Sequence, residues 1–578
     1  ANWVDEDSPA PDGQNENLAG DTVYASIIPV PVINILTTAA TIANGESTII
    51  TFNLVGATSA LAAQTITVGT TNPEDLSYYY IGFSPTPSCT ITYPATSCTI
   101  HLTTSNLTAP TSLMDESPYH LSFNISGGAT AGSITSGFDV TVTFADKTYL
   151  VAGGQTFCAI TGSSNNRPYC WGYNDYGQRG TSSGNQSPVF TNLGTGAPDS
   201  YATITSGYTT SMVMDFFGNS YGWGNNDYGQ IGNNNTATSV YEVTPSVMPS
   251  GVTFKWVAAS SPNSWEYYGN QSCAIARNGD AYCQGYNYQG GLGVGTDNDV
   301  YQPTLVVGGK HYSQIAMTYY STSGIGSNGT LYSWGWGGYN GVDGTNANQQ
   351  VPLAANMTGI NGKFTQLATG YLFVCGLTDT GYVYCIGSGG SGQLVDGTDN
   401  DHYAPAPISS AHQGSYTAIY AGLNTACAIT QSGGIDCWGE ASTSTGEGSL
   451  TGNGSKLNQP TPGAVSLPNG IKATSMTISR YAACALTSTG TAYCWGAGAN
   501  GEIGDGTTND ALTPRAVTMP TGVTFTQITT TLDQGAVCAV GNNQKVYCWG
   551  TSSAGLTGQG TTTPNITIPT QIVDPVNP

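Results

Sequence analysis

One short motif, usually an aromatic residue followed by Cys-Trp-Gly or a variant of it, recurs eight times in the last three quarters of the chain. Its second residue falls at 170, 222, 283, 333, 385, 437, 494 and 548, so neighbouring copies are 50 to 61 residues apart. A period of this length is typical of solenoids and propellers, in which each repeat is one supersecondary unit. Short β-branched and aromatic runs separated by Gly and Asn, without helical periodicity, predict several strands per repeat. The repeat therefore predicts an all-β radial architecture over residues 148–578.

The clearest copies extend the motif by a second conserved stretch. The first copy contains Trp171-Gly172, Asn174, Gly177-Gln178 and Gly180, and the second repeats this pattern from Trp223. The pattern resembles the regulator-of-chromosome-condensation family of β-propeller repeats, whose signature is Trp-Gly followed by an Asn-x-x-Gly-Gln-Leu-Gly-like stretch. The best-known members of that family have seven blades. Eight copies predict eight blades here, or seven if the two ends of the chain share one.

Not every copy keeps the tryptophan. Copies three and five have Gln284 and Ile386 in its place, and copy six loses the pattern after Gly439. The remaining tryptophans occupy one fixed repeat position, so we expect them to form the core between blades rather than a ladder for ligand stacking. Tyrosine is abundant outside the motif as well, and exposed tyrosine suits contacts with proteins or sugars. The sequence does not reveal which tyrosines are exposed.

All fourteen cysteines fall into local pairs, five of which have a spacing of ten residues. A short turn lies between the partners, so an antiparallel hairpin would set them directly opposite each other and within disulfide range. The alternative, zinc, requires closely spaced ligands such as CxxC with histidine nearby, and neither pattern occurs. The predicted disulfides are Cys89–Cys98, Cys158–Cys170, Cys273–Cys283, Cys375–Cys385, Cys427–Cys437, Cys484–Cys494 and Cys538–Cys548.

Two copies of the repeat lack cysteine, and each lacks both partners. Met212 and Gly222 fill the two positions in the second copy, and Ser323 and Ser333 fill them in the fourth. Joint loss is expected of a disulfide and not of two independent thiols. Seven disulfides in turn predict an oxidising environment, and hence an extracellular or cell-surface location.

The first 147 residues differ in pattern from the repeats. Residues 1–22 are polar and acidic, and we expect an extension that buries no core by itself. Residues 23–147 contain about seven alternating β-branched runs, which predict an immunoglobulin-like β-sandwich similar to modules of bacterial surface proteins. Within it, Cys89 and Cys98 are expected to bridge a hairpin. The run 23–36 is either the first strand of this sandwich or a strand donated to a neighbouring subunit.

Charge limits the partners of the chain. It has 12 Lys and Arg against 35 Asp and Glu, a formal net charge of −23, and its first basic residue is Lys147. Nucleic acids and anionic membranes both require a basic patch, so neither is an expected partner. No run of 18 apolar residues occurs, which argues against a membrane span. Because the numbering begins at Ala1 without a methionine or a signal peptide, we interpret the sequence as a processed chain.

Few residue patterns in the chain suggest chemistry. The five histidines are scattered and form no catalytic or metal motif, and no phosphate loop occurs, so no enzyme activity and no cofactor are predicted. Calcium is the one metal considered, through oxygen ligands of loop aspartates. These are Asp297, Asp299, Asp396, Asp399 and Asp401. Nine N-glycosylation sequons also occur, which the abundance of Asn, Ser and Thr alone would explain. They lie at Asn106, Asn124, Asn185, Asn234, Asn270, Asn328, Asn356, Asn453 and Asn565.

Three functional hypotheses follow. The first is a non-enzymatic structural protein, a subunit of a surface filament, sheath or layer that assembles with itself through its N-terminal region. The alternative is a secreted or surface binding propeller, an adhesin or inhibitor that recognises a protein or glycan through its loops. Nucleotide exchange on a small GTPase, which the family resemblance also suggests, fits poorly with the disulfides and the acidic chain.

Overall fold

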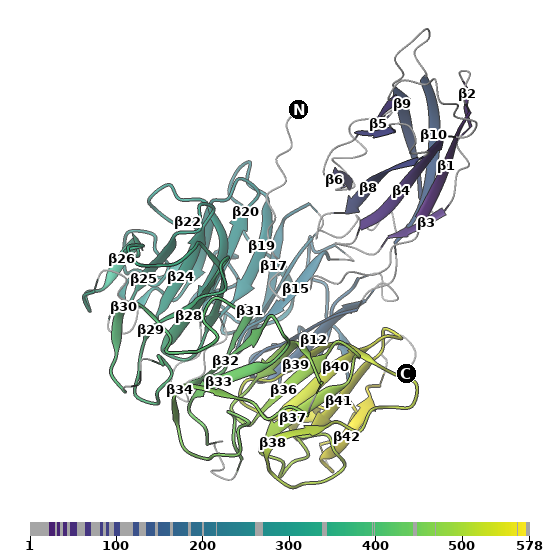
Figure 1. Ribbon diagram of the computed structural model, residues 1–578. Coiled ribbons are helices and arrows are strands. Elements are labelled where there is room, and N and C mark those ends of the chain that lie inside the picture. Colours follow the sequence, from purple (N-terminus) through teal and green to yellow (C-terminus); the bar gives the residue numbers. More distant parts are fainter. Residues whose placement is uncertain are drawn as a thin grey trace. The chain divides into compact units, whose positions relative to one another are not determined.

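The computed structural model describes residues 148–573, apart from residues 162–165, 183–186, 199–200, 216, 261–269, 338–343, 396, 398, 443–447, 469 and 563. In the first 147 residues it describes the backbone of ten strands. The chain divides into two compact units, with a boundary after Lys147. Figure 1 shows the strands in sequence colours. No helix among the described residues is long and apolar enough to cross a membrane.

The first unit consists of two five-stranded sheets, in the orders β2-β1-β4-β8-β6 and β3-β10-β9-β5-β7. Its strands are β1 (Thr22–Ile28), β2 (Val32–Asn34), β3 (Ala39–Ile42), β4 (Ser47–Leu54), β5 (Gln64–Thr70), β6 (Ile81–Ser84), β7 (Ser88–Ile91), β8 (Ser97–Thr104), β9 (Tyr119–Ser126) and β10 (Thr135–Phe144). Ten strands therefore replace the seven expected. The immunoglobulin-like class of this unit stays a prediction.

Strand pairing in this unit bears on two expectations from the sequence. Strand β1 pairs in parallel with β4 of the same chain, so residues 23–28 belong to the unit's own sheet in this structure. Strands β7 and β8, which contain Cys89 and Cys98, lie in different sheets. The expected hairpin between these cysteines is therefore wrong, because β7 pairs with β5 and β8 pairs with β4 and β6. The side chains of this pair lie outside the described residues.

The second unit is an all-β propeller of eight four-stranded sheets, each built from consecutive strands. Because no sheet combines strands from the two ends of the chain, the alternative of seven blades is excluded.

The first strand of each blade contacts the first strands of neighbouring blades and lies on the inside of the ring. These inner strands are β11 (Thr148–Ala152), β15 (Thr203–Ser206), β19 (Phe254–Ala259), β23 (Tyr312–Met317), β27 (Phe364–Thr369), β31 (Tyr416–Ala421), β35 (Ala473–Ile478) and β39 (Phe525–Thr530).

The second and third strands of each blade are almost entirely buried and form the core. The second strands are β12 (Thr156–Thr161), β16 (Thr210–Met214), β20 (Gln271–Ala276), β24 (Ser321–Gly326), β28 (Phe373–Thr378), β32 (Thr425–Thr430), β36 (Ala482–Thr487) and β40 (Ala536–Gly541). The third strands are β13 (Tyr169–Gly172), β17 (Ser220–Asn225), β21 (Ala281–Gly285), β25 (Leu331–Gly335), β29 (Val383–Gly387), β33 (Ile435–Gly439), β37 (Ala492–Gly496) and β41 (Val546–Gly550).

The fourth strands form the exposed rim of the ring. They are β14 (Val189–Phe190), β18 (Ser239–Pro245), β22 (Val300–Leu305), β26 (Gln349–Ala354), β30 (His402–Pro407), β34 (Gln459–Ala464), β38 (Ala511–Ala516) and β42 (Ile566–Gln571). All of them except β14 contain proline. Proline cannot donate a ladder hydrogen bond, so these edges are poor templates for adding a further strand.

The repeat glycine after the tryptophan position produces a bulge between the third and fourth strands. In blade 3 the register shifts between Cys283 and Gly285. Gly285 has φ of +106°, and a Cβ at this position would lie within 2.1 Å of the Asn270 carbonyl oxygen. Only glycine accepts both the positive φ and this close approach. The requirement explains why this glycine is present in all eight copies, including those that lack tryptophan.

Six disulfides staple the second strand of a blade to the third, in blades 1, 3, 5, 6, 7 and 8. In each of them the two Cα atoms lie 4.1 Å apart and the cysteines face each other in register. The expectation of a propeller with disulfide pairs in its blades is thus confirmed. In blade 4 the corresponding pair is Ser323 and Ser333, whose hydroxyl oxygens lie 2.8 Å apart. In blade 2 it is Met212 opposite Gly222.

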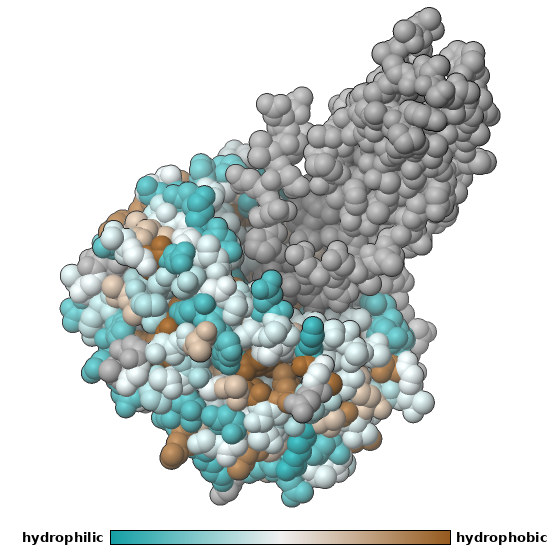
Figure 2. Space-filling model, in the orientation of Figure 1, coloured by the Kyte–Doolittle hydropathy of each residue, from teal (hydrophilic) through white to brown (hydrophobic). Residues whose placement is uncertain are grey.

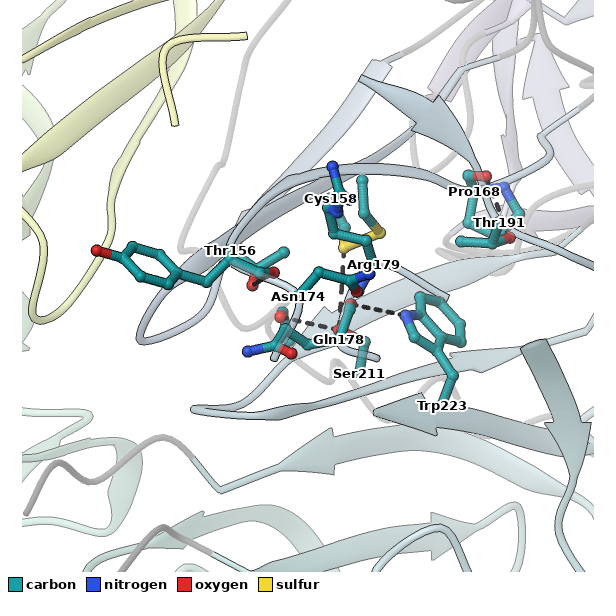
Figure 3. Close-up of a disulfide and its surroundings, with 12 residues drawn as sticks. Thr156, Cys158, Pro168, Asn174, Gln178, Arg179, Thr191, Ser211 and Trp223 are labelled. Atoms are coloured by element: carbon teal, nitrogen blue, oxygen red, sulfur yellow. Dashed lines mark hydrogen bonds between the residues drawn. A yellow bond between two sulfur atoms is a disulfide. The ribbon is translucent and has the colours of Figure 1, made fainter. Parts of the chain in front are cut away.

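The repeat tryptophans fasten neighbouring blades to each other. Trp223 is fully buried, and its indole N–H donates to the Gln178 carbonyl oxygen of the preceding blade at 2.8 Å. Figure 3 shows this contact beside the Cys158 disulfide. Equivalent bonds from Trp438, Trp495 and Trp549 reach the blade before each of them. The tryptophans are therefore core residues, as expected, and not a ladder for a ligand.

The ring closes without a shared blade. The indole N–H of Trp171 in blade 1 donates to the Leu556 carbonyl oxygen in blade 8, at 2.9 Å. On the inner strands, the side-chain amide of Gln527 donates to the Leu150 carbonyl oxygen at 2.6 Å and accepts from the Leu150 N–H at 3.2 Å. Gln366 makes the same two bonds to Ile419 between blades 5 and 6. Closure therefore uses contacts that also occur at other seams.

Candidate functional site: a tyrosine patch on blades 2 to 5

Antiparallel strand order divides the connections of the propeller between two faces. The loops between first and second strands and between third and fourth strands emerge on one face, and the remaining connections emerge on the other. Among the described residues, seven aromatic side chains of blades 2 to 5 gather in loops of the first face. We call this group the tyrosine patch. Its members are Tyr228, Tyr286, Tyr288, Tyr319, Tyr320, Trp336 and Tyr371.

The rings of the patch form an unbroken series of contacts across four blades. Tyr228 of blade 2 meets Tyr286 of blade 3, with ring centroids 4.7 Å apart. Tyr288 of blade 3 lies 5.2 Å from Tyr320 of blade 4. Tyr320 in turn contacts Trp336 at 5.6 Å, within the same blade. Edge-to-face and tilted arrangements at these separations are favourable for aromatic rings.

The far end of the series reaches blade 5. Tyr319 contacts Tyr320 at 3.9 Å and Tyr371 at 5.3 Å, and the Tyr320 hydroxyl donates to the Tyr319 hydroxyl at 3.1 Å. The exposure of the patch varies along it. Tyr288 is 45% exposed, Tyr319 is buried, and the other members are half-buried. A surface of this kind presents ring faces and hydroxyl groups together.

Backbone hydrogen bonds hold the loops of the patch in place. The Tyr319 N–H donates to the Tyr371 carbonyl oxygen, and the Tyr371 N–H donates to the Leu423 carbonyl oxygen of blade 6 at 2.8 Å. The Trp336 N–H donates to the Tyr320 carbonyl oxygen. The Tyr286 N–H donates across its own blade to the Asn270 carbonyl oxygen at 2.8 Å. The aromatic rings are therefore supported by a backbone that joins adjacent blades.

An asparagine, buried in blades 2 and 3 and half-buried in blade 1, organises each of the loops that follow the third strands of these blades. In blade 3 the side-chain oxygen of Asn287 accepts the Leu292 N–H at 2.9 Å, and its amide donates to the carbonyl oxygens of Thr296 and Asn298. Asn226 and Asn174 make comparable bonds in blades 2 and 1. This is the physical reason for the asparagine of the repeat motif. Tyr286 and Tyr288 flank Asn287 and are fixed by it.

One hydroxyl group of the patch has a shifted pKa. Burial raises the pKa of Tyr286 to about 12, with further contributions from Tyr228 and Asp299. Tyr286 consequently acts as a neutral hydrogen-bond donor and acceptor and not as a base.

The surroundings of the patch are acidic. The described loops of this face in blades 2 to 5 carry Asp227, Asp297, Asp299, Asp399 and Asp401 and no lysine or arginine. On the opposite face the same four blades carry Lys255, Arg277, Lys310 and Lys363. The two faces of this half of the ring therefore differ in both charge and aromatic content.

The aspartates considered for calcium have mainly structural roles where the structure describes them. Asp299 accepts the Asn287 N–H at 2.9 Å, and Asp401 accepts the Gly389 N–H at 3.0 Å. Asp510 makes the same bond to Gly498 in blade 7, so this position closes the loop in several repeats. Burial raises the pKa of Asp299. Asp396 lies outside the described residues, and no group of three or more His, Cys, Asp or Glu among the described ones is arranged to hold a metal ion.

The sequons differ in accessibility. Asn270 is buried and accepts a hydrogen bond from the side chain of Gln230 at 3.1 Å, which makes it a poor acceptor for a glycan in the folded chain. Asn453 is half-buried. The exposed ones are Asn234, Asn328, Asn356 and Asn565. Asn106 and Asn185, and the side chain of Asn124, lie outside what the structure describes.

The sequence did not predict the patch, although some of its aromatic residues stand at a recognisable position of the repeat. Tyr286 and Trp336 both follow the bulge glycine of the repeat, where blades 5, 6 and 7 have Ser388, Glu440 and Ala497. Aligning the eight copies at this glycine shows where aromatic residues collect. That loops of four successive blades place them on one face follows only from the strand order.

Comparisons with known proteins agree with the repeat pattern. Two profiles, both described as regulator of chromosome condensation (RCC1) repeat, match residues 364–393 and 473–502, and residues 218–262 and 489–530. The chain is 25% identical over 352 residues to the ultraviolet-B receptor UVR8 of Arabidopsis thaliana, covering 60% of this chain and 76% of the receptor. It is 26% identical over 356 residues to the E3 ubiquitin-protein ligase HERC2 of Homo sapiens. That match covers 60% of this chain but spans only 7% of the ligase.

Similarity to solved structures is limited. Prp20p of Saccharomyces cerevisiae is 19% identical, with a TM-score of 0.47 over 61% of this chain and 85% of the other. Human WBSCR16 is 21% identical, with a TM-score of 0.47 over 60% of this chain and 90% of the other. The chain thus contains RCC1 repeats, folded as an eight-bladed β-propeller with disulfide pairs in its blades.

Proposed function

We propose that this chain is an extracellular, non-enzymatic binding protein that recognises a protein or a glycan through the tyrosine patch. The observation that carries the proposal is the unbroken series of aromatic rings across four blades, all partly exposed except the buried Tyr319, on one face of a disulfide-bonded propeller. Tyrosine and tryptophan supply large contact areas at a low cost in side-chain entropy, and they are enriched at binding hot spots. The extracellular location rests on the six disulfides of the blades.

The chemistry of the patch favours binding over catalysis. A phenol whose pKa lies far above 7, such as that of Tyr286, is a poor general base at neutral pH. Its strength lies in stacking and hydrogen bonding, which require only that the rings be held in place. The backbone bonds between adjacent loops provide this support.

The structural-subunit hypothesis is a second candidate, and one observation favours it. Large apolar residues are exposed on the outer strands of several blades, namely Tyr241, Tyr301, Leu305, Val351 and Ile568. A rim of this kind suits packing against other copies. However, the prolines of the same strands oppose edge-to-edge strand pairing, and the run 23–28 pairs within its own unit. We therefore place this candidate second. Light scattering of secreted, unreduced material separates the two, since a mass near 59.6 kDa contradicts a polymer.

The test of the binding proposal uses peptide and glycan arrays probed with the full, disulfide-intact chain. The Tyr288→Ala/Trp336→Ala double variant removes two rings of the patch. Phe217→Ala/Tyr241→Ala is the matched control, because both residues are exposed aromatics outside the patch. We expect at least one array ligand whose binding falls about tenfold in the patch variant and is unchanged in the control. No array ligand, or an equal loss in both variants, contradicts the proposal.

A further inference from the structure

All charged residues in the described loops around the tyrosine patch are acidic, and this limits the classes of ligand that it can bind. Asp227 is exposed next to Tyr228 in the loop of blade 2, and Asp297 is exposed in the loop of blade 3 that also contains Tyr288. The described loops of this face contain no lysine or arginine in blades 2 to 5. An anionic ligand would meet only like charge there, and a neutral ligand would gain hydrogen bonds to the carboxylates but no attraction between charges.

A cationic ligand would interact favourably with both the aromatic rings and the carboxylates of the site. Arginine and lysine side chains stack favourably on the faces of tyrosine and tryptophan. The arginine guanidinium group also matches carboxylates in a bidentate geometry. Rings at 4.7–6.0 Å from one another offer several such faces within the reach of one extended peptide.

We propose that the patch binds an arginine-bearing basic segment of another protein. The proposal rests on the binding function proposed above and names the class of ligand. The chain itself does not fit as the partner, because a second copy would bring a formal charge of −23 towards the same acidic face. Its own N-terminal 22 residues carry six acidic residues and no basic one. The partner is therefore expected to be a different, basic protein.

The experiment measures fluorescence anisotropy of a labelled peptide of four Gly-Arg repeats with the full, disulfide-intact chain. Matched peptides with Lys or Gln in place of Arg, and neutral hexasaccharides, are the other probes. We expect the affinity to decrease in the order Arg, Lys, Gln. Binding of the Arg peptide should weaken about tenfold in Tyr288→Ala/Trp336→Ala and should be unchanged in Phe217→Ala/Tyr241→Ala.

A second pair of variants separates the site from general attraction to an acidic protein. Asp227→Asn/Asp297→Asn removes two charges beside the patch. Asp175→Asn/Asp505→Asn removes two charges from loops of the same face in blades 1 and 7, outside the patch. The first variant should weaken Arg-peptide binding about threefold to tenfold, and the second by less than twofold. Equal weakening in both variants overturns the proposal, because it shows long-range attraction alone.

The remaining outcomes distinguish failure of this inference from failure of the proposed function. If the Gln peptide or a neutral hexasaccharide binds at the patch and the Arg peptide does not, the cationic ligand class is wrong while the binding function stands. If no probe binds and the arrays also yield no ligand, both are contradicted.

Discussion

The two halves of the ring differ in how strictly they follow the repeat. Blades 1, 6, 7 and 8 have both fastening devices, a disulfide between the second and third strands and a buried tryptophan at the seam. Each of blades 2 to 5 lacks one of them. Blades 2 and 4 have no cysteines, and blades 3 and 5 have Gln284 and Ile386 instead of tryptophan. The tyrosine patch lies on these same four blades.

Each of these four blades therefore keeps one of the two devices, and we expect one to be enough to hold a blade in the ring. In blade 3 the disulfide remains, and Gln284 fills the tryptophan position with its amide bonded to Ser272 at 2.8 Å. In blade 2 Trp223 remains, and Met212 packs opposite Gly222. No blade lacks both devices. Two kinds of variant test this expectation. One removes the device that a blade still has, and the other restores the device that it lacks.

The largest loss of stability is expected when a blade that has only one of the two devices loses it. Trp223→Gln leaves blade 2 with neither a tryptophan nor a disulfide, and it should lower the free energy of unfolding by about 3–5 kcal/mol. Trp495→Gln in blade 7 is the matched control, because Cys484–Cys494 remains there. We expect Trp495→Gln to cost roughly 2 kcal/mol less. Denaturant unfolding without reductant measures both, and equal losses would contradict the idea that the devices back each other up.

A smaller loss is expected when only the disulfide is removed. Cys484→Ser/Cys494→Ser copies the natural serine pair of blade 4 into blade 7, where Trp495 is retained. Opening this short loop should cost about 2–3 kcal/mol in the chain-entropy account. The variant should still fold, and its thermal midpoint reports the loss. A variant that fails to fold would show that blade 7 cannot rely on its tryptophan alone.

The reverse change should stabilise blade 4. Ser323 and Ser333 lie directly opposite each other on β24 and β25, in the register of the native disulfides. Ser323→Cys/Ser333→Cys should form a seventh blade disulfide and add up to about 2 kcal/mol. Mass spectrometry of unreduced peptides verifies the bond. Each single Cys variant is the control, and a double variant that forms the bond without gaining stability would argue that the serine pair already fastens the blade fully.

The smallest expected change in stability concerns blade 7, where a glutamate replaces the glutamine of the repeat motif. Glu502 of blade 7 takes the position of Gln178 and Gln230, is fully buried, and has its pKa raised by desolvation. The folded state therefore binds the proton more tightly than the unfolded state, so stability falls as pH rises from the ordinary glutamate range through the raised pKa.

Glu502→Gln tests this sign. It should remove the pH dependence and raise stability at pH 7 by roughly 1 kcal/mol, while stability at pH 3 stays nearly unchanged. Thermal midpoints between pH 3 and pH 8 provide the measurement, and Asp505→Asn provides a comparison of opposite sign. The pKa of Asp505 is lowered by its hydrogen bonds with Thr507 and by Arg515, against the effect of burial. A wild-type midpoint that rises with pH while the Glu502→Gln midpoint does not would contradict the assignment.

Much of the propeller could be predicted from the sequence, because its determinants are local. The eight copies of the Cys-Trp-Gly motif predicted eight blades, or seven if the two ends shared one, and Cys273 and Cys283 are near enough in sequence for a hairpin to pair them. The joint absence of cysteine at Ser323 and Ser333 was visible for the same reason.

The rest depends on contacts between distant parts of the chain. Cys89 and Cys98 are as close in sequence as the other pairs, but their strands belong to different sheets, which alternation of β-branched residues cannot reveal. Tyr228 and Tyr371 belong to one patch although 143 residues separate them. Their common surface arises from the rotation between successive blades, so it required the three-dimensional arrangement.

Tyrosine nitration footprinting with and without the Gly-Arg peptide tests most directly whether the ligand binds on blades 2 to 5 and not on the other half of the ring. Peptide mass spectrometry would then report the nitration rate of each tyrosine in the full chain. Protection concentrated at Tyr288 and its neighbours, with Tyr241 on the rim unchanged, is the result predicted by the account. Protection spread evenly around the ring, or confined to blades 6 to 8 and 1, would contradict it.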